Sequence, residues 1–176
     1  VILPTFNESE NIYDLICETD LYIRNHSVTN YEFIVVDDDS PDKTWQIVEM
    51  KFGTDSKIKV IRRVDERGLA SAIWTGIQAA QGKIVAWMDC DFSMPPYKLP
   101  ELINKVMDGE CDICVGSRFI KGGKDIRGPT DSWLAVILSR TMNCTISLLL
   151  GHSFKDYTSG FVAARKKILQ KQGLVH

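Results

Sequence analysis

The stretch that most constrains the fold of this chain is an apolar run at 84–88 that ends abruptly in two carboxylates, Asp89 and Asp91. A parallel strand buried on both faces is a continuous hydrophobic run of this kind, and ligands bind just beyond the carboxyl ends of such strands. Mg²⁺ and Mn²⁺ prefer oxygen ligands, and Mg²⁺ is often bound by one or two carboxylates together with substrate phosphates. We therefore expect Asp89 and Asp91 to hold one of these cations and, through it, a diphosphate.

The remaining chain alternates predicted strands with segments of helical periodicity. Apolar runs at 1–3 and 33–36 are typical of buried strands, 57–61 alternates and indicates a strand nearer the edge, and 112–116 is the fifth predicted strand. Strands separated by helices favour parallel pairing with right-handed crossovers. We predict a single α/β domain with a Rossmann-like, mostly parallel sheet flanked by helices.

Both ends of the sequence fall inside predicted elements. Residues 1–3 already have the pattern of the middle of a strand, and the last predicted helix begins near Lys166. We therefore expect one domain over residues 1–176 that is truncated at both ends.

Charge and cysteine content limit the possible functions. The formal net charge is −2, which gives no indication of a nucleic-acid partner. The five cysteines form no disulfide framework by number or spacing, as is typical of a reducing compartment. Cys111 and Cys114 match C-x-x-C, but on a strand over 111–115 their side chains would point to opposite faces. We expect two buried free thiols that share no metal.

Acidic residues follow three of the predicted strands. Glu8 comes after the first strand, Asp37 and Asp38 after the second, and Asp89 and Asp91 after the fourth. The carboxyl ends of these strands converge in a doubly wound sheet, so we expect the acids to lie at one edge. Asp38 ends a fully buried strand and is expected to accept hydrogen bonds from a base or ribose.

Other polar residues in these loops are better explained as helix caps and turns. Asn7 or Ser9 is expected to cap the first helix, and Ser40 or Asp42 the second. Asp39 is expected to lie in a solvated turn.

Two common nucleotide-binding classes are excluded by the motifs. A dinucleotide-binding fold requires G-x-G-x-x-G directly after its first strand, where this chain has Pro-Thr-Phe-Asn-Glu at 4–8. The sequence also contains no G-x-x-x-x-G-K-[ST], which excludes a P-loop nucleotide hydrolase.

Six short motifs occur together in an order that resembles the family 2 glycosyltransferases, most closely their dolichyl- or polyprenyl-phosphate mannosyl/glucosyl synthase branch. The motifs are Leu3-Pro4-Thr5-Phe6-Asn7-Glu8, Val35-Val36-Asp37-Asp38-Asp39-Ser40-Pro41-Asp42, Gly68-Leu69-Ala70-Ser71-Ala72, Met88-Asp89-Cys90-Asp91, Val115-Gly116-Ser117-Arg118-Phe119 and Thr158-Ser159-Gly160-Phe161. The resemblance covers nearly the whole chain and implies the GT-A fold. Asp39 stands where the family usually has glycine, so we expect a left-handed Asp39.

The resemblance implies an inverting glycosyltransferase that uses GDP-mannose or UDP-glucose. Asp89 and Asp91 match the two acids of the family's D-x-D motif, which approach the diphosphate through Mg²⁺ or Mn²⁺. The backbone of the middle residue of that motif touches the nucleotide. The nucleotide-sugar site carried over in this way consists of Pro4, Phe6, Glu8, Val36, Asp38, Asp89, Cys90 and Asp91.

The resemblance also implies an acceptor site for dolichyl or polyprenyl phosphate. Arg118 matches the arginine of the family's G-[ST]-R motif, and Arg127 and Arg140 are further candidates to position the acceptor phosphate. Asp156 is a candidate base or an organiser of the substrate loop. Asp91, Arg118 and Asp156 form the expected catalytic set.

Partner and location follow from the same reasoning. The apolar helix predicted at 133–150 either packs in the core or lies on a membrane surface, where a lipid acceptor would be found. We expect the protein in the cytoplasm or at the cytoplasmic face of a membrane. Two alternatives stay open: an acceptor with a saccharide hydroxyl, which would need Asp156 as a base, and a nucleotide-sugar-binding domain without catalysis.

Overall fold

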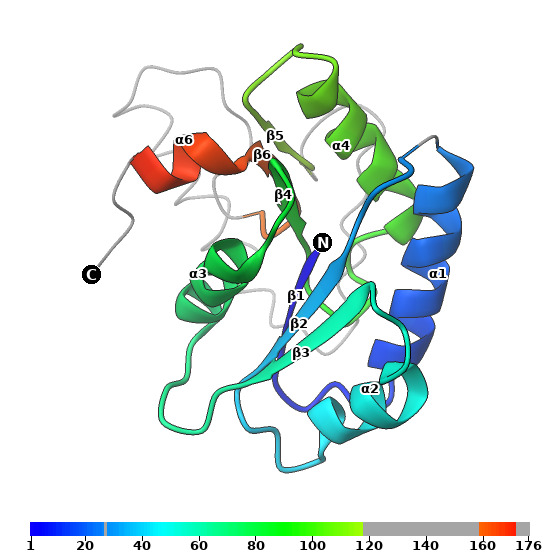
Figure 1. The fold of residues 1–176 in the computed structure, drawn as a ribbon, viewed down its shortest axis with the longest axis vertical. Coiled ribbons are helices and arrows are strands. Elements are labelled where there is room, and N and C mark those ends of the chain that lie inside the picture. The colour runs from blue at the N-terminus through cyan, green and yellow to red at the C-terminus, as the bar shows by residue number, and fades with distance from the viewer. Residues whose placement is uncertain (27, 118–158, 172–176) are drawn as a thin grey trace, which may run out of the picture.

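A computed structural model describes residues 1–26, 28–117 and 159–171 of the chain (Figure 1). The described elements, in chain order, are β1 (Ile2–Thr5), α1 (Ile12–Asn25), β2 (Phe33–Asp37), α2 (Thr44–Phe52), β3 (Ile58–Arg62), α3 (Leu69–Ala79), β4 (Ile84–Trp87), a 3₁₀ turn η1 (Pro96–Lys98), α4 (Leu99–Met107), β5 (Ile113–Val115), β6 (Val162–Arg165) and α6 (Lys166–Lys171). The predicted alternation of strands and helices is confirmed.

The strands form one sheet in the order β3-β2-β1-β4-β6-β5. β1 pairs in parallel with β2 and β4, and β2 pairs in parallel with β3. β6 runs antiparallel to both β4 and β5. The sheet is therefore mostly parallel, as predicted, and β3 is the partly exposed edge strand that the alternation at 57–61 indicates.

Helices cover both faces of the sheet and divide the core into two layers (Figure 1). The helices α1, α2 and α4 pack on one face together with Leu3, Val35, Ala86 and Met88 of the sheet and of its strand ends. On the other face, α3 and α6 pack on Ile2, Ile34, Val36 and Val85. Alternate residues of each strand point to opposite faces, so the continuous apolar runs are explained by burial on both sides.

Helix α3 approaches β1 closely because Gly76 has no side chain. A Cβ atom at Gly76 would lie 2.4 Å from Cγ2 and 3.0 Å from Cγ1 of Ile2, which is itself fully buried. The contact leaves no room for a methyl group unless the helix or the strand moves.

We expect Gly76→Ala to destabilise the protein by about 1–3 kcal/mol, as an overpacked core does. In an open helix position the same change would stabilise by about 1 kcal/mol, because alanine is the better helix former. The sign of the change in the free energy of unfolding, measured by urea denaturation, is therefore the test. A stabilised Gly76→Ala variant would mean that α3 does not lie on Ile2 as described.

The loops after β1 and β2 are joined through residues that were expected to cap helices. The amide of Asn7 donates to Oγ of Ser40 and the amide of Ser9 donates to Oδ2 of Asp42, both at 3.0 Å. The N-cap positions are Asn11 for α1 and Lys43 for α2, and neither helix has a side-chain cap hydrogen bond there, so the predictions that Asn7 or Ser9 caps α1 and that Ser40 caps α2 are wrong. Asp42 does serve the start of α2, since Oδ1 accepts from the amide of Thr44 at 3.0 Å.

Asp39 adopts the left-handed conformation that its place in the glycine position of the motif predicts, with a φ of 54°. Its carboxylate pairs with Arg62 at the end of β3, with 2.7 Å between Nε and Oδ1. Asp39 therefore belongs to a partly exposed ion pair outside the expected site.

The C-x-x-C segment differs from its prediction. Strand β5 begins at Ile113, so Cys111 precedes the strand. The alternation of side chains along a strand therefore does not place Cys111 and Cys114 on opposite faces. Burial and the neighbouring Cys111 side chain raise the pKa of the Cys114 thiol to about 11. The two thiols are neighbours and only partly buried, and both are free. Among the described residues, no group of three or more His, Cys, Asp or Glu side chains is arranged to hold a metal.

Within the described parts of the chain, no helix is long and apolar enough to cross a bilayer. The helix predicted at 133–150 lies outside those parts.

Candidate active site

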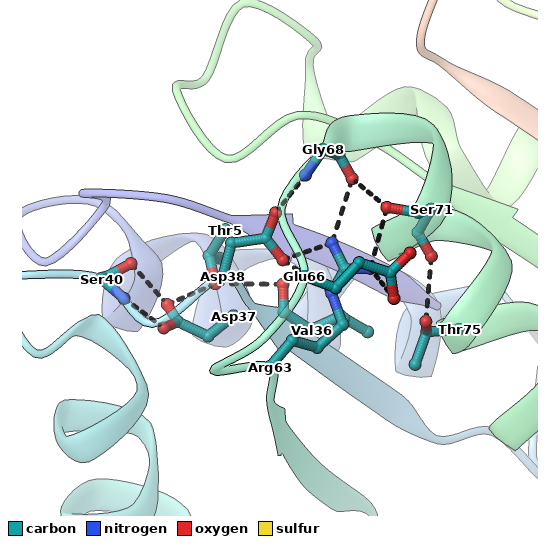
Figure 2. A network of polar contacts seen from close by, with 10 residues as sticks. All are labelled: Thr5, Val36, Asp37, Asp38, Ser40, Arg63, Glu66, Gly68, Ser71 and Thr75. Atoms are coloured by element: carbon teal, nitrogen blue, oxygen red, sulfur yellow. Dashed lines mark hydrogen bonds and ion pairs between the residues drawn. The ribbon is translucent and has the colours of Figure 1, made fainter.

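Asp37 anchors the carboxyl end of β2. Its carboxylate is fully buried and accepts hydrogen bonds from Oγ1 of Thr5 at 2.8 Å and from the amide and hydroxyl of Ser40 at 2.8 and 2.7 Å. Figure 2 shows these contacts. Thr5 belongs to β1 and Ser40 to the loop after β2, so Asp37 fixes the ends of these two strands relative to each other.

The acids that follow β1 and β4 lie close together. Burial raises the pKa of Glu8 above its ordinary value, and the negative charges of Asp91, Asp42 and Asp89 raise it further, against a hydrogen bond from Asn11. The backbone geometry agrees, because β1 pairs with β4 and the thiol of Cys90, which lies between the two acids, donates to the carbonyl of Pro4 at 3.4 Å. The structure thus brings together Glu8, Asp89 and Asp91, as the convergence of the strand ends predicts.

The backbone around Asp89 and Asp91 is held in a tight turn. Oδ1 of Asp91 accepts from the amide of Ser93 at 2.9 Å, and the amide of Asp89 lies 3.4 Å from Sδ of Met94. The chain before β6 passes directly over Asp89, because a Cβ atom at Gly160 would lie 3.2 Å from both carboxylate oxygens. Asp89 is half-buried and Asp91 is exposed, so the pair faces solvent from one side.

Pro4, Val36 and Cys90 have their side chains in the sheet and its core. The Cys90 thiol donates to the carbonyl of Pro4 at 3.4 Å, and burial raises the pKa of this thiol well above its ordinary value. Val36 is fully buried beneath α3. Any contact of these three residues with a nucleotide would therefore use their backbone.

The donor set at Asp89 and Asp91 fits Mg²⁺ or Mn²⁺. Both residues supply hard carboxylate oxygens, and such cations are commonly completed by phosphate and water oxygens. The charges agree with this fit, because Asp89 and Asp91 act on Glu8 as like charges, and a divalent cation bound between the acids would reduce that repulsion.

The raised pKa of Glu8 gives a prediction for the cation-free protein. A carboxyl group whose pKa is higher in the folded than in the unfolded state contributes stability below its unfolded pKa, and this contribution is lost as the pH rises through the folded pKa. Glu8→Gln is therefore expected to be more stable than the wild type near neutral pH and to match it near about pH 4. Thermal melts in EDTA across this range measure the difference. Glu10→Gln, at an exposed position in the same loop, is the matched control. A Glu8→Gln variant that is destabilised at neutral pH would contradict the crowding of the acids.

Asp38 lies in a network that differs from its expected environment (Figure 2). Oδ1 accepts from Nε and Nη2 of Arg63 at 2.7 and 2.5 Å, and Oδ2 accepts from the amide of Gly68 at 2.7 Å. Both members of the ion pair are buried, with side chains 6% and 8% exposed. Both oxygens of Asp38 therefore hold the segment that leads from β3 into α3, and a base or ribose would have to share them.

Arg63 is a site residue that the sequence reasoning did not identify. Its amide donates to the carbonyl of Asp37 at 2.8 Å, and its guanidinium also donates to Oγ of Ser71 at 2.9 Å. The parallel register pairs Asp37 with Arg62, so Asp38 and Arg63 are the next residues on neighbouring strands. Opposite charges directly after two neighbouring parallel strands were the available signal.

Phe6 follows β1 and is 46% exposed, so its side chain is available to a ligand at the edge of the sheet. Arg118, Arg127, Arg140 and Asp156 lie outside the described residues. Gly116, two residues before Arg118 in the sequence, forms hydrogen bonds with the segment that leads into β6. The amide of Gly116 donates to the carbonyl of Phe161 at 2.8 Å, and the hydroxyl of Ser159 donates to the carbonyl of Gly116 at 2.5 Å.

The sequence pattern of glycosyl transferase family 2 matches residues 1–173, and the chain belongs to this family. It is 39% identical over 174 residues to the dolichol-phosphate mannosyltransferase of Pyrococcus furiosus, a match that covers 97% of this chain and 47% of the relative. It is 31% identical over 175 residues to the polyprenol monophosphomannose synthase of Mycolicibacterium smegmatis, with 97% and 63% covered. The chain thus spans about half to two-thirds of the length of these relatives, and the resemblance stated from the motifs is confirmed.

Solved structures with the same fold include glucosyl-3-phosphoglycerate synthase from Mycobacterium tuberculosis. Its complex with Mn²⁺ and UDP-glucose is 25% identical, with a TM-score of 0.67 and 96% of this chain and 56% of that chain covered. Its complex with Mg²⁺ and UDP is 24% identical, with a TM-score of 0.66 and the same coverage. These likenesses confirm the predicted GT-A fold.

Proposed function

We propose that this chain is the donor-binding and catalytic part of an inverting, metal-dependent glycosyltransferase that moves a hexose from a nucleotide sugar to dolichyl or polyprenyl phosphate. The observation that carries the proposal is that the carboxyl ends of β4 and β1 lie side by side, where the thiol of Cys90 donates to the carbonyl of Pro4, so that Asp89, Asp91 and Glu8 follow neighbouring strands. The names of the two relatives support a polyprenyl phosphate as the acceptor.

Asp89 and Asp91 are the residues that would hold Mg²⁺ or Mn²⁺. When bound, such a cation supplies charge neutralisation on the diphosphate that leaves. The exposed carboxylate of Asp91 faces the donor, and the half-buried carboxylate of Asp89 is held in place beneath Gly160. Neither acid acts as a nucleophile or a base in this proposal.

The nucleoside of the donor lies across the ends of β1 and β2. Phe6 offers an exposed aromatic face for the base, and Glu8 and Asp38 offer carboxylate oxygens for the ribose and the base. The backbones of Pro4, Val36 and Cys90 complete this side. GDP-mannose and UDP-glucose are the two candidate donors: the name of the Pyrococcus furiosus relative supports mannose as the sugar, and the solved complex of glucosyl-3-phosphoglycerate synthase contains UDP-glucose.

The acceptor phosphate is expected to meet Arg118, Arg127 and Arg140. A phosphate oxygen is already anionic at neutral pH, so positioning it for direct displacement is more important than removing a proton. Asp156 then serves as an organiser of the substrate loop, or as the base if the acceptor is a hydroxyl. The reaction takes place at a membrane surface, on its cytoplasmic side, where such lipids are reached.

The proposal is tested by incubating the full-length protein with Mn²⁺, a short polyprenyl phosphate and either GDP-mannose or UDP-glucose. We expect a lipid-linked hexose whose anomeric configuration, read by NMR, is inverted relative to the donor. Transfer to a saccharide hydroxyl in place of the lipid would contradict the acceptor assignment. Donor binding without transfer or donor hydrolysis would mean that the domain binds nucleotide sugars without catalysing a reaction.

A further inference from the structure

An exposed arginine covers the exposed aromatic ring at the edge of the sheet. Cζ of the Arg67 guanidinium lies 5.3 Å from the ring centroid of Phe6, whose residue is 46% exposed. A cation–π contact at such an exposed site is weak, so a flat ligand that stacks on Phe6 can displace the guanidinium. The displaced side chain would then remain beside the ligand.

Arg67 directly precedes Gly68, and Figure 2 shows Gly68 in the buried network around Asp38 and Arg63. The next residue, Gly68, has a φ of +139°, which side chains rarely adopt. Its amide donates to Oδ2 of Asp38 at 2.7 Å and its carbonyl accepts from Nη2 of Arg63 at 3.1 Å. The base of the Arg67 side chain is therefore held near the ends of β1 and β2, while its guanidinium stays exposed.

The order of the strands places Arg67 at the nucleobase end of the proposed donor site. The cation and diphosphate are proposed at the end of β4, followed along the edge by the ends of β1, β2 and β3. Three strand spacings separate β4 from β3, which is about 14 Å. Phe6 follows β1, next to β4, and Arg67 follows β3, so Arg67 reaches Phe6 from the side away from the diphosphate.

From this arrangement we infer that Arg67 reads the edge of the nucleobase that stacks on Phe6, and that it favours guanine over uracil. Guanine presents O6 and N7 as two neighbouring acceptors that match the guanidinium fork, whereas the corresponding edge of uracil has one carbonyl acceptor. Arg63, the arginine of the buried network, is paired with Asp38, so its guanidinium is not available to the base. The inference rests on the proposed function and deepens it, since it selects a guanosine-diphosphate sugar as the donor.

The test is calorimetric titration of GDP and of UDP into the full chain with Mn²⁺. The wild type is expected to bind GDP at least about tenfold more tightly than UDP. Arg67→Gln should weaken GDP binding by about tenfold and change UDP binding by less than about twofold, because only guanine loses a pair of hydrogen bonds. Phe6→Leu should weaken both ligands by a similar factor, since stacking tolerates any base.

Arg62→Gln is the matched control. Arg62 also lies over an aromatic ring, with Cζ 4.2 Å from the centroid of Trp45, and it pairs with Asp39. Its removal deletes the same charge and the same kind of contact, and should leave the binding of GDP and UDP unchanged. Equal weakening of GDP and UDP by Arg67→Gln, no weakening of either, or a wild type that prefers UDP would each overturn the inference. A wild type that binds neither nucleotide would overturn the proposed function as well.

Discussion

Replacing Asp91 with asparagine is expected to lower the rate of sugar transfer by about a hundredfold to a thousandfold, the usual effect of removing one group that stabilises charge in the transition state. Asparagine keeps the size of the side chain and an oxygen that can accept from the amide of Ser93, as Oδ1 of Asp91 does at 2.9 Å. The change therefore removes a negative charge from the exposed acid without opening the turn. The measurement is kcat for hexose transfer to a short polyprenyl phosphate over a range of Mn²⁺ concentrations.

Asp108→Asn is the control for this experiment. Asp108 is an exposed carboxylate at the end of α4, and its removal deletes the same charge outside the proposed site. It should leave both kcat and the dependence on Mn²⁺ unchanged. Full turnover of Asp91→Asn, with the Mn²⁺ dependence of the wild type, would contradict the role assigned to Asp91.

The second large effect concerns the stability of the domain. Arg63→Met is expected to lower the free energy of unfolding by about 3–5 kcal/mol, because it leaves the buried charge of Asp38 without an opposite charge. Methionine retains an unbranched apolar side chain, so the loss is mainly electrostatic. Urea denaturation monitored by circular dichroism measures this difference.

A matched pair of variants separates burial from simple pairing. Arg24 pairs with Asp20 at 2.6 Å, but the two side chains are 58% and 23% exposed. Arg24→Met should therefore lower the stability far less than Arg63→Met, because an exposed ion pair contributes little. The double variant Arg63→Met with Asp38→Asn should regain part of the loss, since no buried charge remains. Equal losses for Arg63→Met and Arg24→Met would mean that the Asp38–Arg63 pair is not buried.

The layered fold is predictable from the sequence because its signals are local and agree with one another. The strands β1 and β2 consist almost entirely of buried residues, and β3 alternates because it lies at the edge. The left-handed Asp39 follows from its place in the glycine position of a motif. Each of these features depends on a few neighbouring residues and on the period of the strand.

The caps and thiols were harder to predict because they depend on where each element begins. Ser9 and Ser40 have the side chains of capping residues, but their partners are in the neighbouring loop and in Asp37. Cys111 lies two residues before the start of β5, so the alternation of a strand does not apply to it. A shift of two residues in the start of a strand is enough to reverse such an argument.

The candidate site also has one part that the sequence predicts and one part that it does not. The meeting of Glu8 with Asp89 and Asp91 follows from the topology alone, since the carboxyl ends of parallel strands share an edge. The engagement of Asp38 by Arg63 depends on the relative register of β2 and β3, which the sequence does not contain as a local signal. Long-range contacts between polar side chains are thus the part of the site that required the structure.

The most direct test of the central claim is calorimetric titration of GDP and UDP into the chain with Mn²⁺ and then with EDTA. We predict that at least one nucleotide binds in Mn²⁺ and that its affinity falls by about tenfold or more in EDTA, because Asp89 and Asp91 otherwise repel the diphosphate. An unchanged affinity in EDTA would show that these two acids do not hold a cation for the donor, and would contradict the account.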